Sequence, residues 1–223
     1  MTPRVLINAF MLLAGVAHSQ APAPEAPEPQ MPRRYLNALS TPRHPHPVDT
    51  ADYARATRWF VTHPDAAVRV LAKAYDERRR ARRRITYVLG LLKRDDTLPL
   101  LSKALRDQSS SVSWTAGRGL AIHPSVKAAQ ILIDQLHNAT GEESWHTAIF
   151  WLSKRGDKAH CKLITSFLSD PDGTHRYYAL QSGDRLGCIS EAHLKAARMD
   201  PYPSVKTLAL ELLQKGTRPA QGE

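Results

Sequence analysis

The sequence predicts an all-α protein, an α-solenoid built from about five helix pairs and a final helix. Only 11 of the 223 residues are Gly and 7% are aromatic, which argues against a loop-rich or all-β chain. Runs rich in Ala, Leu, Lys and Arg favour helix by intrinsic propensity. The strongest observation is a segment pattern that recurs about every 31 residues, since tandem recurrence at such a period is typical of stacked helical repeats.

Five segments of the chain align without gaps over their central residues. Their starts lie 31, 32, 31 and 30 residues apart, at Ala81, Val112, Ser144, His175 and Val205. Positions one, five, eight and nine of each segment fall on one helical face, so we expect five amphipathic first helices. A small residue at position five lets two helix backbones approach closely. Position five holds Ile85, Ala116, Ala148, Ala179 and Ala209, and position nine holds Leu89, Leu120, Leu152, Gly183 and Leu213.

Second helices are expected between the aligned segments. Residues 97–107, 125–136 and 159–170 place Leu, Ile or Val at intervals of three and four. Residues 50–63 and 65–75 supply an earlier pair. The repeat domain therefore spans residues 50–215, and each pair buries its apolar face only against its neighbours. Helix caps are expected at Asp95, Asp157 and Ser190.

The two ends of the chain differ in composition from the repeats. Residues 1–19 combine a basic start, an apolar run and small residues before the expected cut after Ser19, the layout of a secretory signal peptide. The apolar run is shorter than the ~20 residues that span a bilayer. Residues 20–49 are Pro-rich and predict an extended, disordered tether, and residues 216–223 predict a disordered tail. We therefore expect a periplasmic or secreted protein with no transmembrane span in its mature chain.

The repeats resemble a known family. Short HEAT repeats, including the subclass named after phycobilin lyases, follow a pattern that resembles Ile85-Thr-Tyr-Val-Leu-Gly90, Ala179-Leu-Gln-Ser-Gly-Asp-Arg-Leu-Gly187 and Val205-Lys-Thr-Leu-Ala209. The resemblance covers residues ~50–215 and implies a HEAT-like superhelix. Similar repeats serve in scaffolds, chromophore attachment, DNA repair and transport, and no catalytic motif of those proteins can be placed on this chain.

Charge points to one candidate binding site. The chain has 31 Lys and Arg against 21 Asp and Glu, a formal charge of +10 that attracts anionic partners. Six arginines within seven positions cover the expected turn before one first helix, where cations oppose the helix dipole. A guanidinium cluster can grip carboxylate or phosphate, although a solvated loop is the alternative. The cluster consists of Arg78, Arg79, Arg80, Arg82, Arg83 and Arg84.

Two tryptophans are added to the candidate partner-binding residues. Trp114 and Trp145 stand at positions three and two of their repeats, where we expect them to be half exposed. Such aromatic side chains can anchor a protein partner, and packing at the rim of the core is the alternative.

The only two cysteines, Cys161 and Cys188, fall at the same edge of neighbouring repeats. In an exported protein two cysteines usually pair, so we expect a disulfide. A zinc site with His160 and His193, or two free thiols, are the alternatives.

The sequence predicts a non-enzymatic scaffold that binds an acidic protein partner and needs no cofactor or metal. It holds no Ser/His/Asp grouping, Gly-rich phosphate loop or helical His pair. An anionic polymer, nucleic acid or acidic glycan, bound at the Arg-rich edge is the alternative, and nucleic acid conflicts with export. A lyase role rests on analogy of fold alone.

Overall fold

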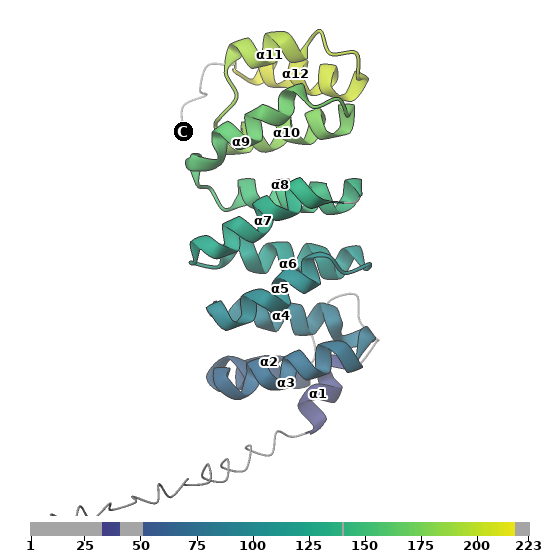
Figure 1. Ribbon diagram of the computed structural model, residues 1–223, viewed down its shortest axis with the longest axis vertical. Helices are drawn as coiled ribbons and strands as arrows, with labels where there is room; N and C mark the ends of the chain where they lie inside the picture. The colour runs from purple at the N-terminus through teal and green to yellow at the C-terminus, as the bar shows by residue number, and fades with distance from the viewer. Residues whose placement is uncertain (1–32, 41–50, 140, 217–223) are drawn as a thin grey trace, which may run out of the picture. The chain divides into compact units, whose positions relative to one another are not determined.

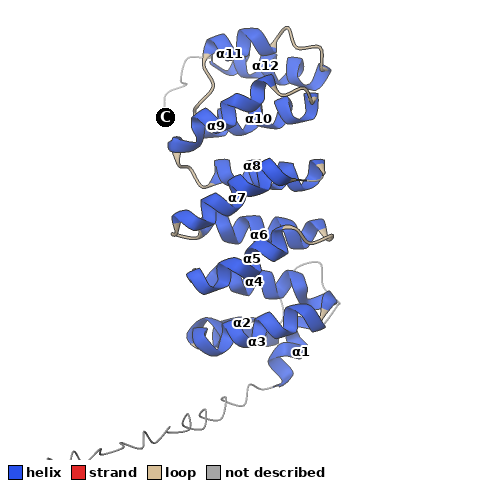
Figure 2. Ribbon diagram, in the orientation of Figure 1, coloured by secondary structure: helices blue, strands red, loops and turns tan. Residues whose placement is uncertain are grey.

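The computed structural model describes residues 33–40, 51–139 and 141–216, which form twelve α-helices, four short 3-10 turns and no strand (Figure 2). The predicted signal peptide, most of the predicted tether and the tail lie outside the described residues. Among the described helices, none is both long enough and apolar enough to cross a bilayer.

The described helices of the repeat domain form five pairs and a final helix, as predicted. The first helices are α2 (Ala51–Thr62), α4 (Arg82–Leu92), α6 (Ser110–Ile122), α8 (Glu142–Lys154) and α10 (Gly173–Leu186). The second helices are α3 (Pro64–Glu77), α5 (Leu98–Leu105), α7 (Val126–Asn138), α9 (Cys161–Ser166) and α11 (Glu191–Ala197), and α12 (Pro203–Gly216) ends the stack (Figure 1).

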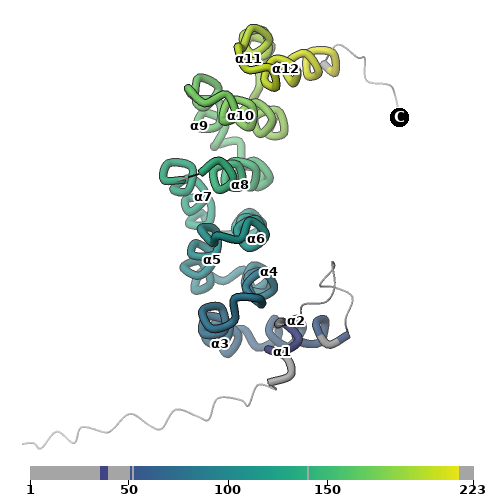
Figure 3. Tube along the Cα trace, turned by 90° about the vertical axis from the view of Figure 1, so that its right-hand side faces the viewer, coloured from purple at the N-terminus to yellow at the C-terminus, as the bar shows by residue number. Residues whose placement is uncertain are grey.

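First helices stack on first helices. Helix α4 packs on α6, α6 on α8, α8 on α10, and α10 on α12. The second helices α3, α5, α7 and α9 form the other layer, as the side view of the stack in Figure 3 shows. Each second helix also packs on the next first helix, for example α5 on α6 and α7 on α8. No pair therefore has a core of its own, and burial depends on the neighbouring pair.

Most of the repeat positions predicted to face the core are buried. All five residues at position five are 0% exposed, and so are the leucines at position nine of the first three repeats. The closest backbone approach between first helices lies elsewhere, at two glycines. A Cβ atom added to Gly90 of α4 would lie 2.8 Å from the Cα atom of Gly119 on α6. Because real Cβ atoms do not come that close to backbone, this crossing requires glycine.

Two of the three predicted helix caps are confirmed. The Asp157 side chain accepts a hydrogen bond from the Ala159 N–H, and the Ser190 hydroxyl accepts one from the His193 N–H. Asp95 instead lies in the first turn of η2 (Asp95–Thr97), where its carboxylate pairs with Lys127 of the next repeat at 3.4 Å.

The structure revises the predicted tether at one place. Residues Arg33–Ser40 form helix α1 inside the stretch that was expected to be extended. These eight residues contain no proline, and their helix has an apolar face that packs on α2. Leu39 on that face is 0% exposed, so burial of its side chain explains why this part joins the repeat domain.

We predict that Gly90→Ala lowers the free energy of unfolding by about 1–2 kcal/mol, because the backbones of α4 and α6 must separate to admit the methyl group. Alanine has a higher helix propensity than glycine, which by itself would raise the free energy of unfolding. The sign of the measured change therefore distinguishes the steric effect from the propensity effect. Urea unfolding of the variant measures it.

Gly141→Ser is the control for this substitution. It also adds a side chain to a glycine, but at a site with no atom within 4 Å of the new Cβ atom. A stability gain in Gly90→Ala would contradict the close crossing.

Candidate functional site

The arginine cluster lies at the predicted turn, in η1 (Arg79–Ala81) and at the start of α4. The structure divides it into two sets. Arg78, Arg82 and Arg84 are half-buried and bind groups of the protein itself. The side chains of Arg79, Arg80 and Arg83 are exposed, and no hydrogen bond or ion pair joins these side chains to a described residue. Only the second set is free to meet a partner.

Two arginines of the first set hold α1 on the repeat domain. An Arg84 guanidinium N–H donates to the carbonyl oxygens of Ala38 and Leu39, at 3.1 and 3.4 Å. Arg78 donates to the side-chain oxygen of Asn37 at 3.1 Å. These cations cover the C-terminal end of α1, where carbonyl groups have no partner within the helix.

Arg82 belongs to a polar network between repeats. Its guanidinium lies 3.1 Å from the Asp107 carboxylate and donates to the Tyr75 carbonyl at 3.0 Å. The Tyr75 hydroxyl donates to the same carboxylate at 2.8 Å. Burial on its own would raise the pKa of Asp107, but the hydrogen bonds from Ser109 and Tyr75 and the Arg82 charge outweigh it and lower the pKa.

The same arrangement recurs three repeats later. Arg176, also at position two, binds Asp200 through Nε and Nη2, both at 2.8 Å, and donates to the Asp170 carbonyl at 2.8 Å. Both arginines join the turn before their helix to an aspartate in the following turn. Sequence reasoning missed this role, although arginine at position two with aspartate 24 or 25 residues later was a visible signal.

Trp145 corrects a prediction. It stands at position two, like these arginines, and is 3% exposed rather than half exposed. Its ring stacks on His175 with centroids 4.1 Å apart and meets Phe167 edge-on at 5.1 Å. Position two faces the turn between repeats, so Trp145 packs there and is not available to a partner.

Trp114 keeps its predicted exposure, at 37%. Its ring contacts side chains of α8, among them Phe150 and His146, whose ring centroids lie 4.7 and 5.8 Å away. His146 in turn stacks on Tyr178 of α10 at 3.8 Å. The three partners are half-buried, so a continuous row of aromatic side chains crosses α6, α8 and α10. We call Trp114, His146, Phe150 and Tyr178 the aromatic ladder.

Cations border the ladder. The Arg185 guanidinium lies 4.5 Å and the Lys154 ammonium 5.7 Å from the centre of the Phe150 ring. Arg118 lies 5.9 Å from the Tyr87 ring centre. Arg185, Lys154 and Arg118 form no ion pair with a carboxylate of the described residues. The same holds for Arg83. Together with the ladder they form the aromatic–basic face: Arg83, Trp114, Arg118, His146, Phe150, Lys154, Tyr178 and Arg185.

A shallow groove of about 440 Å³ opens at one end of this face. Arg83, Trp114 and His146 line it, together with the hydroxyl groups of Ser110, Ser111, Thr115 and Thr147 and the carboxylate of Glu143. The groove thus presents to a ligand one aromatic wall, one guanidinium without an ion-pair partner among the described residues, and several hydroxyl groups.

Burial changes the acid–base behaviour of two members of the face. It lowers the pKa of His146, an effect that Glu142 opposes, so the imidazole favours its neutral form. Burial also lowers the pKa of Arg185, whose guanidinium donates to the Ser153 hydroxyl at 2.9 Å. Arginine nevertheless stays protonated in proteins. The face therefore combines permanent positive charge with apolar rings.

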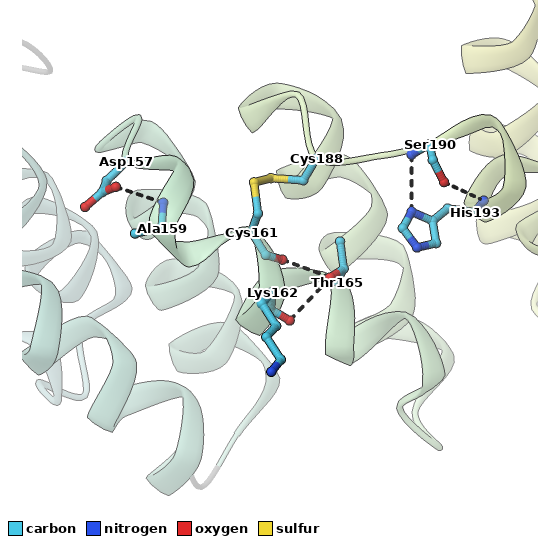
Figure 4. Close-up of a disulfide and its surroundings, with 8 residues drawn as sticks. All are labelled: Asp157, Ala159, Cys161, Lys162, Thr165, Cys188, Ser190 and His193. Atoms are coloured by element: carbon cyan, nitrogen blue, oxygen red, sulfur yellow. Dashed lines mark hydrogen bonds between the residues drawn. A yellow bond between two sulfur atoms is a disulfide. The ribbon is translucent and has the colours of Figure 1, made fainter.

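The cysteines are joined, which confirms the predicted disulfide. Cys161 begins α9 and Cys188 follows α10, and their Cα atoms lie 5.5 Å apart (Figure 4). Gly187 makes this geometry accessible, because its φ of 73° ends α10 in the left-handed conformation that glycine tolerates. The bridge connects neighbouring helix pairs.

The two histidines of the zinc alternative have other contacts. His193 accepts a hydrogen bond from the Ser190 N–H, and His160 lies 3.7 Å from Asp157. Within the described residues, no group of three or more His, Cys, Asp or Glu side chains is placed to hold a metal ion.

Comparison with known proteins finds a likeness of part of the repeat domain to HEAT repeats. The family model for HEAT repeats matches residues 65–144, which comprise α3 to the start of α8. A search of curated proteins gave no match. HEAT repeats commonly mediate contacts between proteins.

We predict that Arg82→Ala lowers the free energy of unfolding by about 1–3 kcal/mol at pH 7, because it removes a partner of a largely buried carboxylate. The pKa of Asp107 is lower in the folded than in the unfolded chain, so its contribution is present above pH ~4 and is lost as pH falls through the folded value. The difference between wild type and variant in urea unfolding should shrink on acidification.

Arg83→Ala is the matched control, since it removes a neighbouring exposed arginine without such a network. Its stability should stay within about 0.5 kcal/mol of wild type. Equal destabilisation by both substitutions would contradict the division of the cluster.

We predict that replacing both cysteines by serine lowers the free energy of unfolding by about 3–4 kcal/mol, since the bridge closes a loop of sequence separation 27. Reduction of the wild type should reach the same stability and should leave the double variant unchanged. Two alkylatable thiols in the unreduced protein, measured by mass spectrometry, would refute the bridge.

Proposed function

We propose that this chain, which carries HEAT repeats, is an exported, non-enzymatic scaffold that binds an acidic protein partner through its aromatic–basic face. Stacked helix pairs present an extended surface, to which successive first helices contribute side chains. Guanidinium groups that stay charged, and aromatic rings that can bury apolar surface against a partner, suit binding of that partner rather than proton transfer.

One observation carries the proposal. Four successive first helices, α4, α6, α8 and α10, each contribute a cation that has no carboxylate partner among the described residues, and three of them contribute half-exposed aromatic rings that touch one another. Arg and Trp are enriched among residues that dominate binding energy in protein interfaces. Unpaired cations beside exposed rings therefore favour an acidic partner with apolar side chains.

Export is supported by chemistry in the repeat domain as well as by the leader-like composition of residues 1–19. A disulfide forms and persists in oxidising compartments such as the periplasm or the extracellular space. The bridge between Cys161 and Cys188 fits such a compartment. The leader itself lies outside the described residues.

Binding of an anionic polymer is the second candidate, because Arg79, Arg80 and Arg83 are exposed and unpaired within the described structure. The two candidates differ in salt dependence. Contacts to several phosphate or sulfate groups cost decades of affinity between low and moderate salt, whereas an interface anchored by aromatic burial loses less.

We predict that Trp114→Ala reduces recovery of the partner by about tenfold or more, because it removes the most exposed ring of the face. The measurement is quantitative crosslinking in the native cell, followed by identification of the crosslinked protein and a salt titration of its affinity.

Val126→Ala serves as the control, since Val126 is an exposed apolar residue, 81% accessible, on α7 in the other layer. Unchanged recovery with Trp114→Ala, or equal losses with both variants, would refute binding at the aromatic–basic face.

A further inference from the structure

We propose that the groove at the end of the aromatic–basic face binds a small amino-carboxylate, an amino acid or short peptide that carries its carboxylate and ammonium groups on an apolar body. This inference goes beyond the proposed function, because the ligand is a small molecule rather than the acidic protein partner. The groove has a volume of about 440 Å³, which lies within the range of pockets that hold small molecules.

Opposite charges line this groove. Arg83 belongs to α4 and Glu143 to α8, and α6 lies between these two helices in the stack (Figure 1). Both side chains are exposed, and neither forms an ion pair with a described residue. The groove therefore offers a cation from one helix and a carboxylate from another, which suits a ligand with both charges better than a purely anionic one.

The start of α6 adds positive charge to the groove. Ser110 and Ser111 of its first turn line the groove, and no acidic residue lies in that turn. The side chain of Ser109, which precedes the helix, makes no capping hydrogen bond. Helix α8 differs, since its first turn holds two glutamates. A ligand carboxylate is therefore favoured between Arg83 and the start of α6, where the helix dipole is not offset by an acid.

Thr147 gives an independent sign of a ligand. It lines the groove and is 2% exposed, yet its hydroxyl makes no hydrogen bond to a described residue. Its methyl group faces α6, since a Cβ atom added to Gly117 would lie 3.1 Å from that methyl carbon, and this leaves the hydroxyl for the groove. Buried hydroxyl groups are normally hydrogen-bonded, because an unpartnered one costs free energy. A polar ligand in the groove supplies the missing partner.

Trp114 provides the surface for the apolar body of the ligand. Its exposed ring belongs to α6, the middle helix of the groove, and its centroid lies 5.8 Å from that of the His146 ring on α8. Burial lowers the pKa of His146, so its imidazole adds no full positive charge beside Glu143. An ammonium group of the ligand thus meets a carboxylate and a neutral imidazole, while apolar atoms of the ligand cover the tryptophan ring.

The test measures binding of small probes to the full chain by isothermal titration calorimetry. The probes are the tripeptide Ala-Phe-Ala and the amino acid phenylalanine, each with free ends, N-acetylated and C-amidated. Glucuronate is added because it has a carboxylate and hydroxyl groups but no amine. The tighter of the two free ligands identifies the source as peptide or amino acid. We expect it to bind about tenfold or more tightly than its two blocked forms and glucuronate, because each charged end forms a charge-assisted hydrogen bond.

Variants of the protein assign each end of the ligand to a side chain. Arg83→Ala should weaken the free ligand about tenfold and remove its advantage over the amidated form, and Glu143→Gln should do the same relative to the acetylated form. Arg79→Ala and Glu142→Gln are the matched controls, since neither residue lines the groove, and they should change affinity by less than about twofold. Thr147→Val should weaken binding several-fold without lowering the melting temperature, because its hydroxyl has no partner among the described residues to lose.

Equal binding of free and blocked ligands overturns the assignment of two charged ends. Binding that is unchanged in both Arg83→Ala and Thr147→Val overturns the location, and glucuronate that binds more tightly than both amino-carboxylates overturns the ligand class. If no probe binds while recovery of the cellular partner depends on Trp114, this inference fails and the proposed function stands. If the amino-carboxylate binds as expected but recovery of the partner does not depend on Trp114, the proposed function fails and this inference stands.

Discussion

Each helix pair of this domain is too small to enclose its own apolar side chains, so the fold depends on contact between one pair and the next. The alanines at position five are buried between stacked first helices, and at Gly90 and Gly119 even a methyl group would not fit. Polar networks reinforce the same contacts, since Arg82 and Arg176 connect the turn before their own helix to an aspartate in the next turn between repeats. Contact between neighbouring helix pairs therefore determines both the stability of the domain and the spacing of groups on its surface.

The sequence was sufficient to predict this architecture, because tandem recurrence exposes the core positions directly. The alanines and leucines at positions five and nine marked the first helices, and the shared edge of Cys161 and Cys188 predicted their bridge. Helix α1 was missed, since eight residues between proline-rich stretches carry too little periodicity to reveal an apolar face. Only its contacts with α2 and Arg84 define it.

The candidate site was predicted only in part. Charge counting located the arginines but could not tell which guanidinium groups the protein itself uses, because carbonyl partners such as those of Ala38 and Tyr75 come from the fold. Trp145 was misplaced for a related reason, since position two faces the turn rather than solvent. Phe150 at position seven and Arg185 at position eleven could have been found by following the stripe that begins at position three, where Trp114 lies.

The disulfide changes how the C-terminal end of the stack can open. In a linear array, a terminal repeat has a neighbour on one side only and frays first. The bridge joins the start of α9 to the turn after α10, so the pair α10/α11 and the final helix α12 cannot separate from α8 without carrying α9 with them. Unfolding from the C-terminal end must then involve a larger cooperative unit. The backbone amides of α10 are therefore protected from solvent exchange, and the N-terminal end of the stack is the easier point of entry for proteases.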